Sequence, residues 1–158
     1  MVPALLLITN AGILFGWAKP VPYNPYNLRD QKWGEALVAA AGPATNLLIA
    51  LIFGVVIRFA DFLTLGPAFV SLAAYIVYIN ILLAFFNMIP FPPLDGSKII
   101  QPFLPVSWAM AYRNFLAQFE RFGLIGTFLF IFIFIQIFWK PFSTLVQAVF
   151  FIITGQSF

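Results

Sequence analysis

Long apolar runs separated by short polar stretches make up most of this sequence of 158 residues. The runs at residues 35–60, 62–89 and 122–139 contain almost no charged side chains. A helix that crosses a bilayer needs about 20 predominantly apolar residues, so each run is long enough to span. Residues 1–17 are apolar but short, and we expect them to be part of another span. The pattern predicts an all-α polytopic membrane protein with about three full transmembrane helices and a partial N-terminal span.

The stretch at residues 97–121 has a different pattern, in which aromatic side chains recur every three or four positions. The recurring residues, which continue into the next span, are Trp108, Tyr112, Phe115, Phe119 and Phe122. This spacing places them on one face of a helix with polar residues opposite, which is typical of a helix lying at the membrane interface. Beyond Lys140-Pro141, residues 145–153 are too short to cross alone, and we expect a tail that re-enters or lies flat.

Composition supports a single membrane-embedded domain over residues 1–158. Hydrophobic residues form 63% of the chain and charged residues 8%, whereas a soluble domain carries about a quarter charged residues. The net charge of +3 comes from basic residues scattered among apolar runs, which argues against a nucleic-acid partner and for the lipid bilayer. Cysteine and histidine are both absent, so neither disulfides nor thiolate metal sites can form.

The basic residues also predict the orientation of the spans. Six of the eight lie in two polar segments, 18–34 and 98–121: Lys19, Arg29, Lys32, Lys98, Arg113 and Arg121. Positively charged loops stay in the cytoplasm, so we expect both segments to be cytoplasmic. The other two, Arg58 and Lys140, fall at the opposite ends of their predicted helices.

Asp95 is the most informative candidate for chemistry, because it directly follows a long apolar run. A carboxylate at membrane depth costs about 2.5 to 3.5 kcal/mol on insertion scales unless a partner such as a cation offsets it. Three prolines precede it, Pro90, Pro92 and Pro93. Each removes a backbone donor, so the backbone here is broken or extended, which is tolerated only inside protein or along a wet cavity. Gly96 then allows a close backbone approach where a helix restarts.

Other interpretations of these residues remain open. Asp-Gly is also an ordinary turn, and Asp95 with Lys98 would then form a helix start with a local ion pair. Gly42-Pro43 predicts a kinked seam of small residues, where Asn46 either bonds to a neighbouring helix or lines a polar cavity next to Asp95. Asn87 could donate to a peptide carbonyl or cap the broken helix.

Several of these residues resemble motifs of the site-2 protease family of intramembrane zinc metallopeptidases, in its compact bacterial and archaeal branch. The residues that match Asn-x-x-Pro…Leu-Asp-Gly are Asn87, Pro90, Pro93, Leu94, Asp95 and Gly96. Gly42-Pro43-x-x-Asn46 and the loop GWAKPVPYNP look like the same branch. On this resemblance the chain is the C-terminal part of the family's core.

The resemblance implies regulated intramembrane proteolysis of a transmembrane protein or peptide, in a prokaryotic cell membrane. In the family, zinc is held by two histidines of a His-Glu-x-x-His helix and by the aspartate of Leu-Asp-Gly, and the glutamate activates water. Carried over, Asp95 is the third zinc ligand. Asn87 and the adjacent prolines would position substrate, and Asn46 would be a supporting polar residue.

The chain departs from the family because it has no histidine. One aspartate cannot hold a catalytic zinc ion, so we expect the chain to bind zinc weakly and to be inactive alone. We further expect the His-Glu-x-x-His helix in frame upstream of Met1. One alternative is a catalytically inactive pseudoprotease or scaffold. The other is a small transporter with an ion site near Asp95, which the sequence of the spans supports less.

Overall fold

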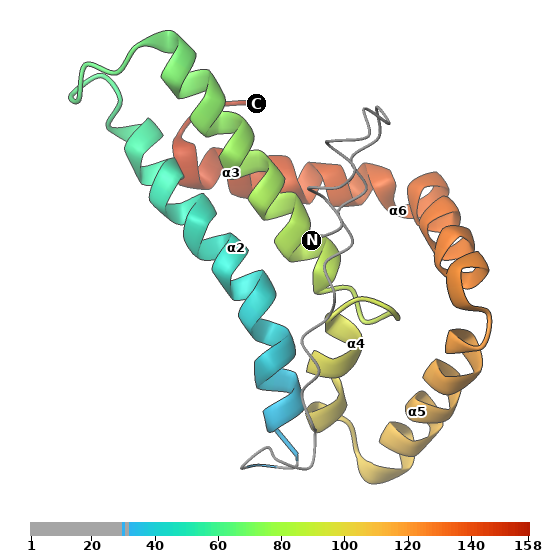
Figure 1. Cartoon of the computed structure of the whole chain (residues 1–158). Coiled ribbons are helices and arrows are strands. Elements are labelled where there is room, and N and C mark those ends of the chain that lie inside the picture. The colour runs from blue at the N-terminus through green and yellow to red at the C-terminus, as the bar shows by residue number, and fades with distance from the viewer. Residues whose placement is uncertain (1–29, 31) are drawn as a thin grey trace, which may run out of the picture.

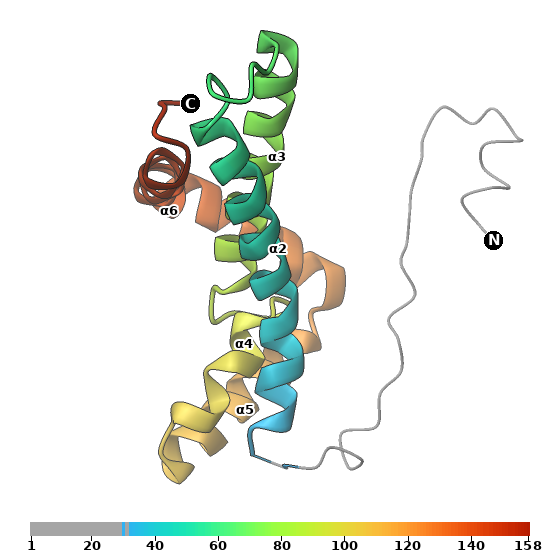
Figure 2. The same ribbon diagram turned by 90° about the vertical axis from the view of Figure 1, so that its left-hand side faces the viewer.

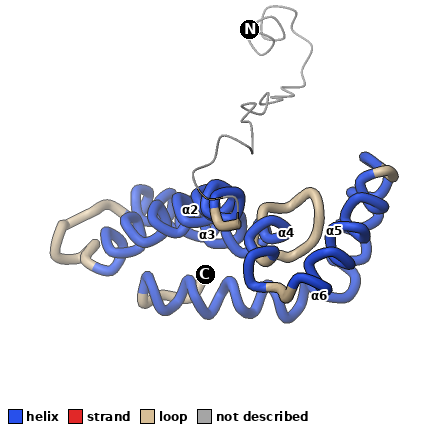
Figure 3. Tube along the Cα trace, turned by 90° about the horizontal axis from the view of Figure 1, so that it is seen from below, coloured by secondary structure: helices blue, strands red, loops and turns tan. Residues whose placement is uncertain are grey.

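The computed structural model describes Asp30 and residues 32–158, which contain helices and no strands (Figures 1 and 3). In chain order the helices are α2 (Gly34–Arg58), α3 (Pro67–Asn87), α4 (Gly96–Ile99), the 3-10 helix η2 (Gln101–Phe103), α5 (Val106–Glu120) and α6 (Gly123–Thr154). Three of them, α2, α3 and α6, are long and apolar enough to cross a membrane. The all-α polytopic prediction is confirmed. The expectation for residues 1–17 lies outside the described residues.

A hairpin of α2 and α3 forms the centre of the fold, with the two helices side by side (Figures 1 and 2). On α3, one small or branched residue per turn faces inward: Ala73, Val77, Ile81 and Ala84 are each 2% exposed or less. Small residues let helix backbones approach closely, which is how helices associate in membranes where lipid is as apolar as the side chains. Alanines along α2, such as the fully buried Ala50, complete this seam.

The start of α2 is fixed by a polar turn. The Asp30 carboxylate accepts hydrogen bonds from the backbone amides of Trp33 (3.0 Å) and Lys32 (2.8 Å). These bonds, the one from Trp33 first, lower the pKa of this exposed carboxyl from its ordinary value, because they favour its charged form. The polar segment before α2 therefore ends in a turn whose geometry is suited to starting a helix.

The last helix differs from the expected span and separate tail. Instead, α6 continues as one helix of 32 residues with Pro141 inside it, and it bends midway so that its second limb crosses α2 and α3 (Figure 1). Proline removes one helical hydrogen bond and kinks a helix without having to end it. Val146 and Phe150, one turn apart, are buried against the α2–α3 seam. The packing of this second limb explains why the helix continues past Lys140-Pro141.

The C-terminal end of α6 is docked near the end of α2. Arg58 donates a hydrogen bond from Nη1 to the carbonyl oxygen of Ile152 (2.9 Å), and Phe158 stacks on Tyr78 with ring centroids 4.2 Å apart. Gly54 is needed at this crossing, since a Cβ there would overlap the side chain of Ile153. Arg58 thus lies at the end of the hairpin opposite Lys32, Lys98 and Arg113.

Candidate metal-ligand site

The chain leaves helical geometry between α3 and α4, where the three prolines lie. Short backbone hydrogen bonds hold this segment in a compact turn, from the Phe91 amide to the Ile89 carbonyl (2.7 Å) and from the Leu94 amide to the Phe91 carbonyl (2.9 Å). Proline cannot donate such bonds and fixes its own φ, so this sequence cannot continue α3. The turn returns the chain toward α2, and α4 begins directly after Asp95.

Aromatic contacts fix this turn from the other side. The Phe91 ring stacks on Phe130 of α6 with centroids 4.1 Å apart, and it meets Phe119 of α5 edge-on at 4.5 Å. The hydroxyl of Tyr112 on α5 donates to the Pro90 carbonyl oxygen at 2.9 Å. Burial raises the pKa of Tyr112, so this hydroxyl keeps its proton and remains a donor at neutral pH. Helices α5 and α6 therefore hold the proline turn in place.

Gly96 is held against the backbone of the same turn. A Cβ at this position would overlap the carbonyl groups of Met88 and Ile89, so no side chain fits without a backbone shift. Gly96 is buried, and so is the next residue, Ser97, whose hydroxyl donates to the Leu94 carbonyl oxygen (2.7 Å). The close approach expected of this glycine has a specific cause: α4 restarts directly against the end of the preceding helix.

The structure brings Asp95 to Gly42. A Cβ built on Gly42 would lie 3.5 Å from Oδ2 of Asp95, so the carboxylate points at the α2 backbone where the glycine leaves room. Pro43 beside it is buried, and Asn46 is partly buried one helical turn further along α2. The carboxylate forms no cap hydrogen bond to α4, and the described residues give it no ion pair. Asp95 does stand at the start of α4, where its carbonyl oxygen accepts from the Lys98 amide at 2.9 Å, but its side chain does not cap the helix.

The remaining predicted site residues lie around the same turn without meeting the carboxylate. Asn87 is the last residue of α3 and is partly buried, while Pro90 and Pro93 are exposed. Among the described residues, neither Asn46 nor Asn87 forms a side-chain hydrogen bond. As far as the described residues are concerned, both amides are available to a ligand. Sequence reasoning did not identify Phe91 and Tyr112 as supports of the site, although the aromatic spacing of the α5 segment had placed Tyr112 on its aromatic face.

The juxtaposition of Asp95 and Gly42 can be tested in this cysteine-free chain. The double variant Gly42→Cys, Asp95→Cys should be joined within one molecule by a short bifunctional thiol reagent, because the two side chains face each other. Gly66 lies at the far end of α3, about 30 Å away for a helix of 21 residues. The matched pair Gly66→Cys, Asp95→Cys should not be joined. Equal cross-linking of both pairs, measured by mass spectrometry, would contradict the structure.

The donor set does not by itself fit a catalytic zinc ion. Within the part of the chain that the structure describes, no group of three or more histidine, cysteine, aspartate or glutamate side chains could hold a metal. Histidine and cysteine are absent from the whole sequence. Asp95 offers one carboxylate where catalytic zinc takes three protein ligands. Further ligands, such as histidine nitrogens, would be needed to complete a zinc site.

Comparisons with known proteins agree with the motif around Asp95. Residues 60–134, which include α3, the proline turn, α4 and α5, match Peptidase family M50. "Putative zinc metalloprotease YwhC" of Bacillus subtilis (strain 168) is 34% identical over 126 residues, covering 76% of this chain and 55% of that protein. "Putative zinc metalloprotease MJ0611" of Methanocaldococcus jannaschii is 31% identical over 100 residues, covering 62% of this chain and 50% of that protein.

A third relative shares a shorter region. "Putative zinc metalloprotease Rip3" of Mycobacterium tuberculosis is 41% identical over 69 residues, which are 42% of this chain and 17% of that protein. The chain thus spans about half the length of the first two relatives and less of the third. No solved structure matches the chain. The family match, the relatives and the Leu-Asp-Gly turn together identify this chain as an M50-type member of the site-2 protease family.

Proposed function

We propose that this chain contributes the Leu-Asp-Gly part of an intramembrane zinc metalloprotease, with Asp95 as one of three zinc ligands. The observation that carries the proposal is the position of Asp95. Its carboxylate lies at the end of a spanning helix, in a turn held by Phe91 and Gly96, and faces the open surface at Gly42. The turn belongs to the region matched to the protease family.

The energetics of this carboxylate support a cation as its partner. A charged aspartate at the bilayer centre costs about 2.5 to 3.5 kcal/mol on insertion scales, and less toward the interface. The described residues offset none of this cost with an ion pair or a cap hydrogen bond. A divalent cation next to Asp95 would stabilise its ionised form more than any neutral partner could. A fixed carboxylate to which the described residues offer no ion pair is well suited to bind a metal ion.

The neighbouring predicted residues have supporting roles in this proposal. Asn87, at the end of α3, has an amide that could pair with the backbone of an extended transmembrane substrate. The exposed Pro90 and Pro93 give that substrate a surface that has no competing backbone donors. On α2, Gly42-Pro43 leaves space in front of the carboxylate, and Asn46 adds a polar group one turn away. We place this site on the cytoplasmic side of a prokaryotic cell membrane, following the basic residues.

A catalytically inactive scaffold is the second candidate, and the absence of histidine from the printed sequence favours it. In that case, the turn would still bind an unfolded membrane segment through Asn87 and the prolines. Asp95 would have no catalytic task. The two proposals share the fold and differ in what happens when histidines are supplied.

The distinguishing experiment adds the missing ligands. A membrane hairpin that carries His-Glu-x-x-His is fused before residue 1, and the fusion is co-expressed with a tagged single-span substrate. We expect cleavage by the fusion and none by the chain as printed, because only the fusion has three ligands. Immunoblotting of the substrate tag measures the product.

The control is the same fusion with the motif glutamate changed to glutamine, which should stop cleavage and keep zinc binding. A folded, zinc-loaded fusion that never cleaves substrate would favour the scaffold. Cleavage by the printed chain without the hairpin would show that the ligand count is wrong.

A further inference from the structure

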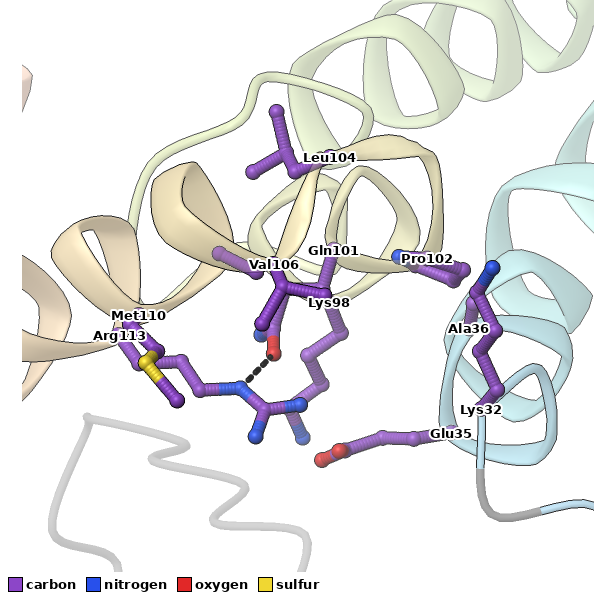
Figure 4. A pocket seen from close by; sticks show the side chains of 11 residues that line it. Lys32, Glu35, Ala36, Lys98, Gln101, Pro102, Leu104, Val106, Met110 and Arg113 are labelled. Carbon is purple, nitrogen blue, oxygen red and sulfur yellow. Dashed lines mark hydrogen bonds between the residues drawn. The ribbon is translucent and has the colours of Figure 1, made fainter.

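A second site lies at the end of the hairpin, separate from the carboxylate of Asp95. The start of α2, the α4–η2 segment and α5 enclose a cavity of about 280 Å³ (Figure 4). Its polar lining comes from Lys32, Glu35, Lys98, Gln101 and Arg113. Asp95, Asn87 and Asn46 do not line it. Nothing in the protease chemistry uses these residues.

The cavity is electropositive. Three cationic side chains and one carboxylate line it, which gives a formal charge of +2 (three minus one). The side chains of Glu35, Lys98 and Arg113 extend from three different segments into the same space (Figure 4). Arg113 donates from Nε to Oε1 of Gln101 at 3.0 Å, so its guanidinium is held in orientation by a neutral partner. A guanidinium held in this way presents its remaining donors in a fork that suits phosphate oxygens.

The other wall of the cavity is apolar. It is formed by Ala36, Pro102, Leu104, Val106 and Met110. A site for a free inorganic anion needs no such wall, whereas a lipid presents a phosphate joined to a glycerol and two acyl chains. The combination of a basic side and an apolar side therefore fits an amphipathic ligand better than a small ion.

The position of the cavity, at the start of α2, also indicates a lipid ligand. Helix α2 has 25 residues and is about 37 Å long, whereas the hydrocarbon core is about 30 Å thick. Glu35 is in its first turn, and Lys32 lies just before it. These residues are therefore at the level of the lipid headgroups when α2 spans the bilayer.

We propose that this cavity binds the phosphate of an anionic phospholipid, with the start of the acyl chains against its apolar wall. Lys98 and Arg113 would contact the phosphate, and Lys32, just before α2, would add to the positive potential. Basic pockets between membrane helices are suited to anionic headgroups. Each lysine or arginine near the membrane surface adds to the attraction for them. The site would anchor α5 to the membrane surface next to the proline turn.

The test uses the full chain in detergent, titrated with phosphatidylglycerol and with phosphatidylcholine that carry the same fluorescent acyl chain. We expect tighter binding of phosphatidylglycerol. Lys98→Gln and Arg113→Gln should each weaken it about five-fold and leave phosphatidylcholine binding unchanged. Lys140→Gln removes the same charge from an exposed position of α6 and should change neither affinity.

Loss of lipid binding could also result from misfolding, so the test includes a variant that should bind phosphatidylglycerol more tightly. Glu35→Gln removes the one carboxylate of the cavity, so the affinity for phosphatidylglycerol should rise. Equal binding of the two lipids, or an equal effect of Lys140→Gln, would overturn the proposal. So would displacement of the labelled lipid by inorganic phosphate as readily as by unlabelled phosphatidylglycerol, which would indicate a site for the free anion.

Discussion

Gly96→Ala should destabilise the protein by about 3 kcal/mol or more, at the upper end of what overpacking of a tight site costs. The added Cβ would meet the Met88 and Ile89 carbonyl groups, which are backbone atoms and cannot rotate away as a side chain would. Either α4 must move away from the proline turn, or the turn must open. Thermal unfolding of the protein in detergent, followed by circular dichroism, measures the loss.

The matched control is Gly66→Ala, the same change at another glycine next to a helix. No atom lies within 4 Å of a Cβ at Gly66, and its φ of −67° suits alanine. We expect a change within about 1 kcal/mol, since alanine gains in the unfolded state and loses slightly as a helix cap. Equal stability of the two variants would mean that α4 does not pack on the turn as described.

Hydrophobic pattern was sufficient to predict the spanning helices, because bilayer thickness sets their length. The runs at 35–60 and 62–89 became α2 and α3 with ends that differ by a few residues, since Gly66-Pro67 delays the start of α3. Pro141 led to a wrong prediction, because we expected a separate tail beyond it. The proline bends α6 without ending it, and the second limb is packed through Val146 and Phe150 against the hairpin, a long-range contact that the local pattern does not contain.

For the candidate site too, local sequence predicted some features, whereas others depend on long-range contacts. The proline turn and Asp95 follow from local chemistry, because prolines break a helix and a carboxylate is costly near apolar residues. The residues that hold this turn in place could not be predicted from local chemistry. Phe91 is held by Phe119 and Phe130, which are 28 and 39 positions further along the chain (119 − 91 and 130 − 91). Aromatic richness alone did not indicate which rings would meet.

The distribution of basic residues, which we used only to predict orientation, also bears on the second site. Lys32, Lys98 and Arg113 were predicted to lie on one side of the membrane, and the structure gathers them around one cavity. Which side faces the cytoplasm remains a prediction. The cavity itself depends on how the α4–η2 segment places α5 relative to the start of α2, which no sequence pattern specified.

Asp95→Asn in the fusion that carries His-Glu-x-x-His should lower zinc affinity about 100-fold or more. A neutral amide replaces the one carboxylate among the three ligands, and even residues that only support zinc ligands alter affinity about 10- to 100-fold. The shape of the side chain is preserved, so the contact with Gly42 and the thermal stability of the metal-free protein should change little. The matched control is Asp61→Asn, the same change at an exposed residue between α2 and α3.

Zinc content after dialysis of the purified fusion, measured by elemental mass spectrometry, tests most directly whether Asp95 is a metal ligand. The account predicts about one zinc ion per chain in the fusion and in its Asp61→Asn variant, and almost none in Asp95→Asn or in the chain without the hairpin. Full zinc content in a folded Asp95→Asn fusion, or stoichiometric zinc in the histidine-free chain, would contradict it.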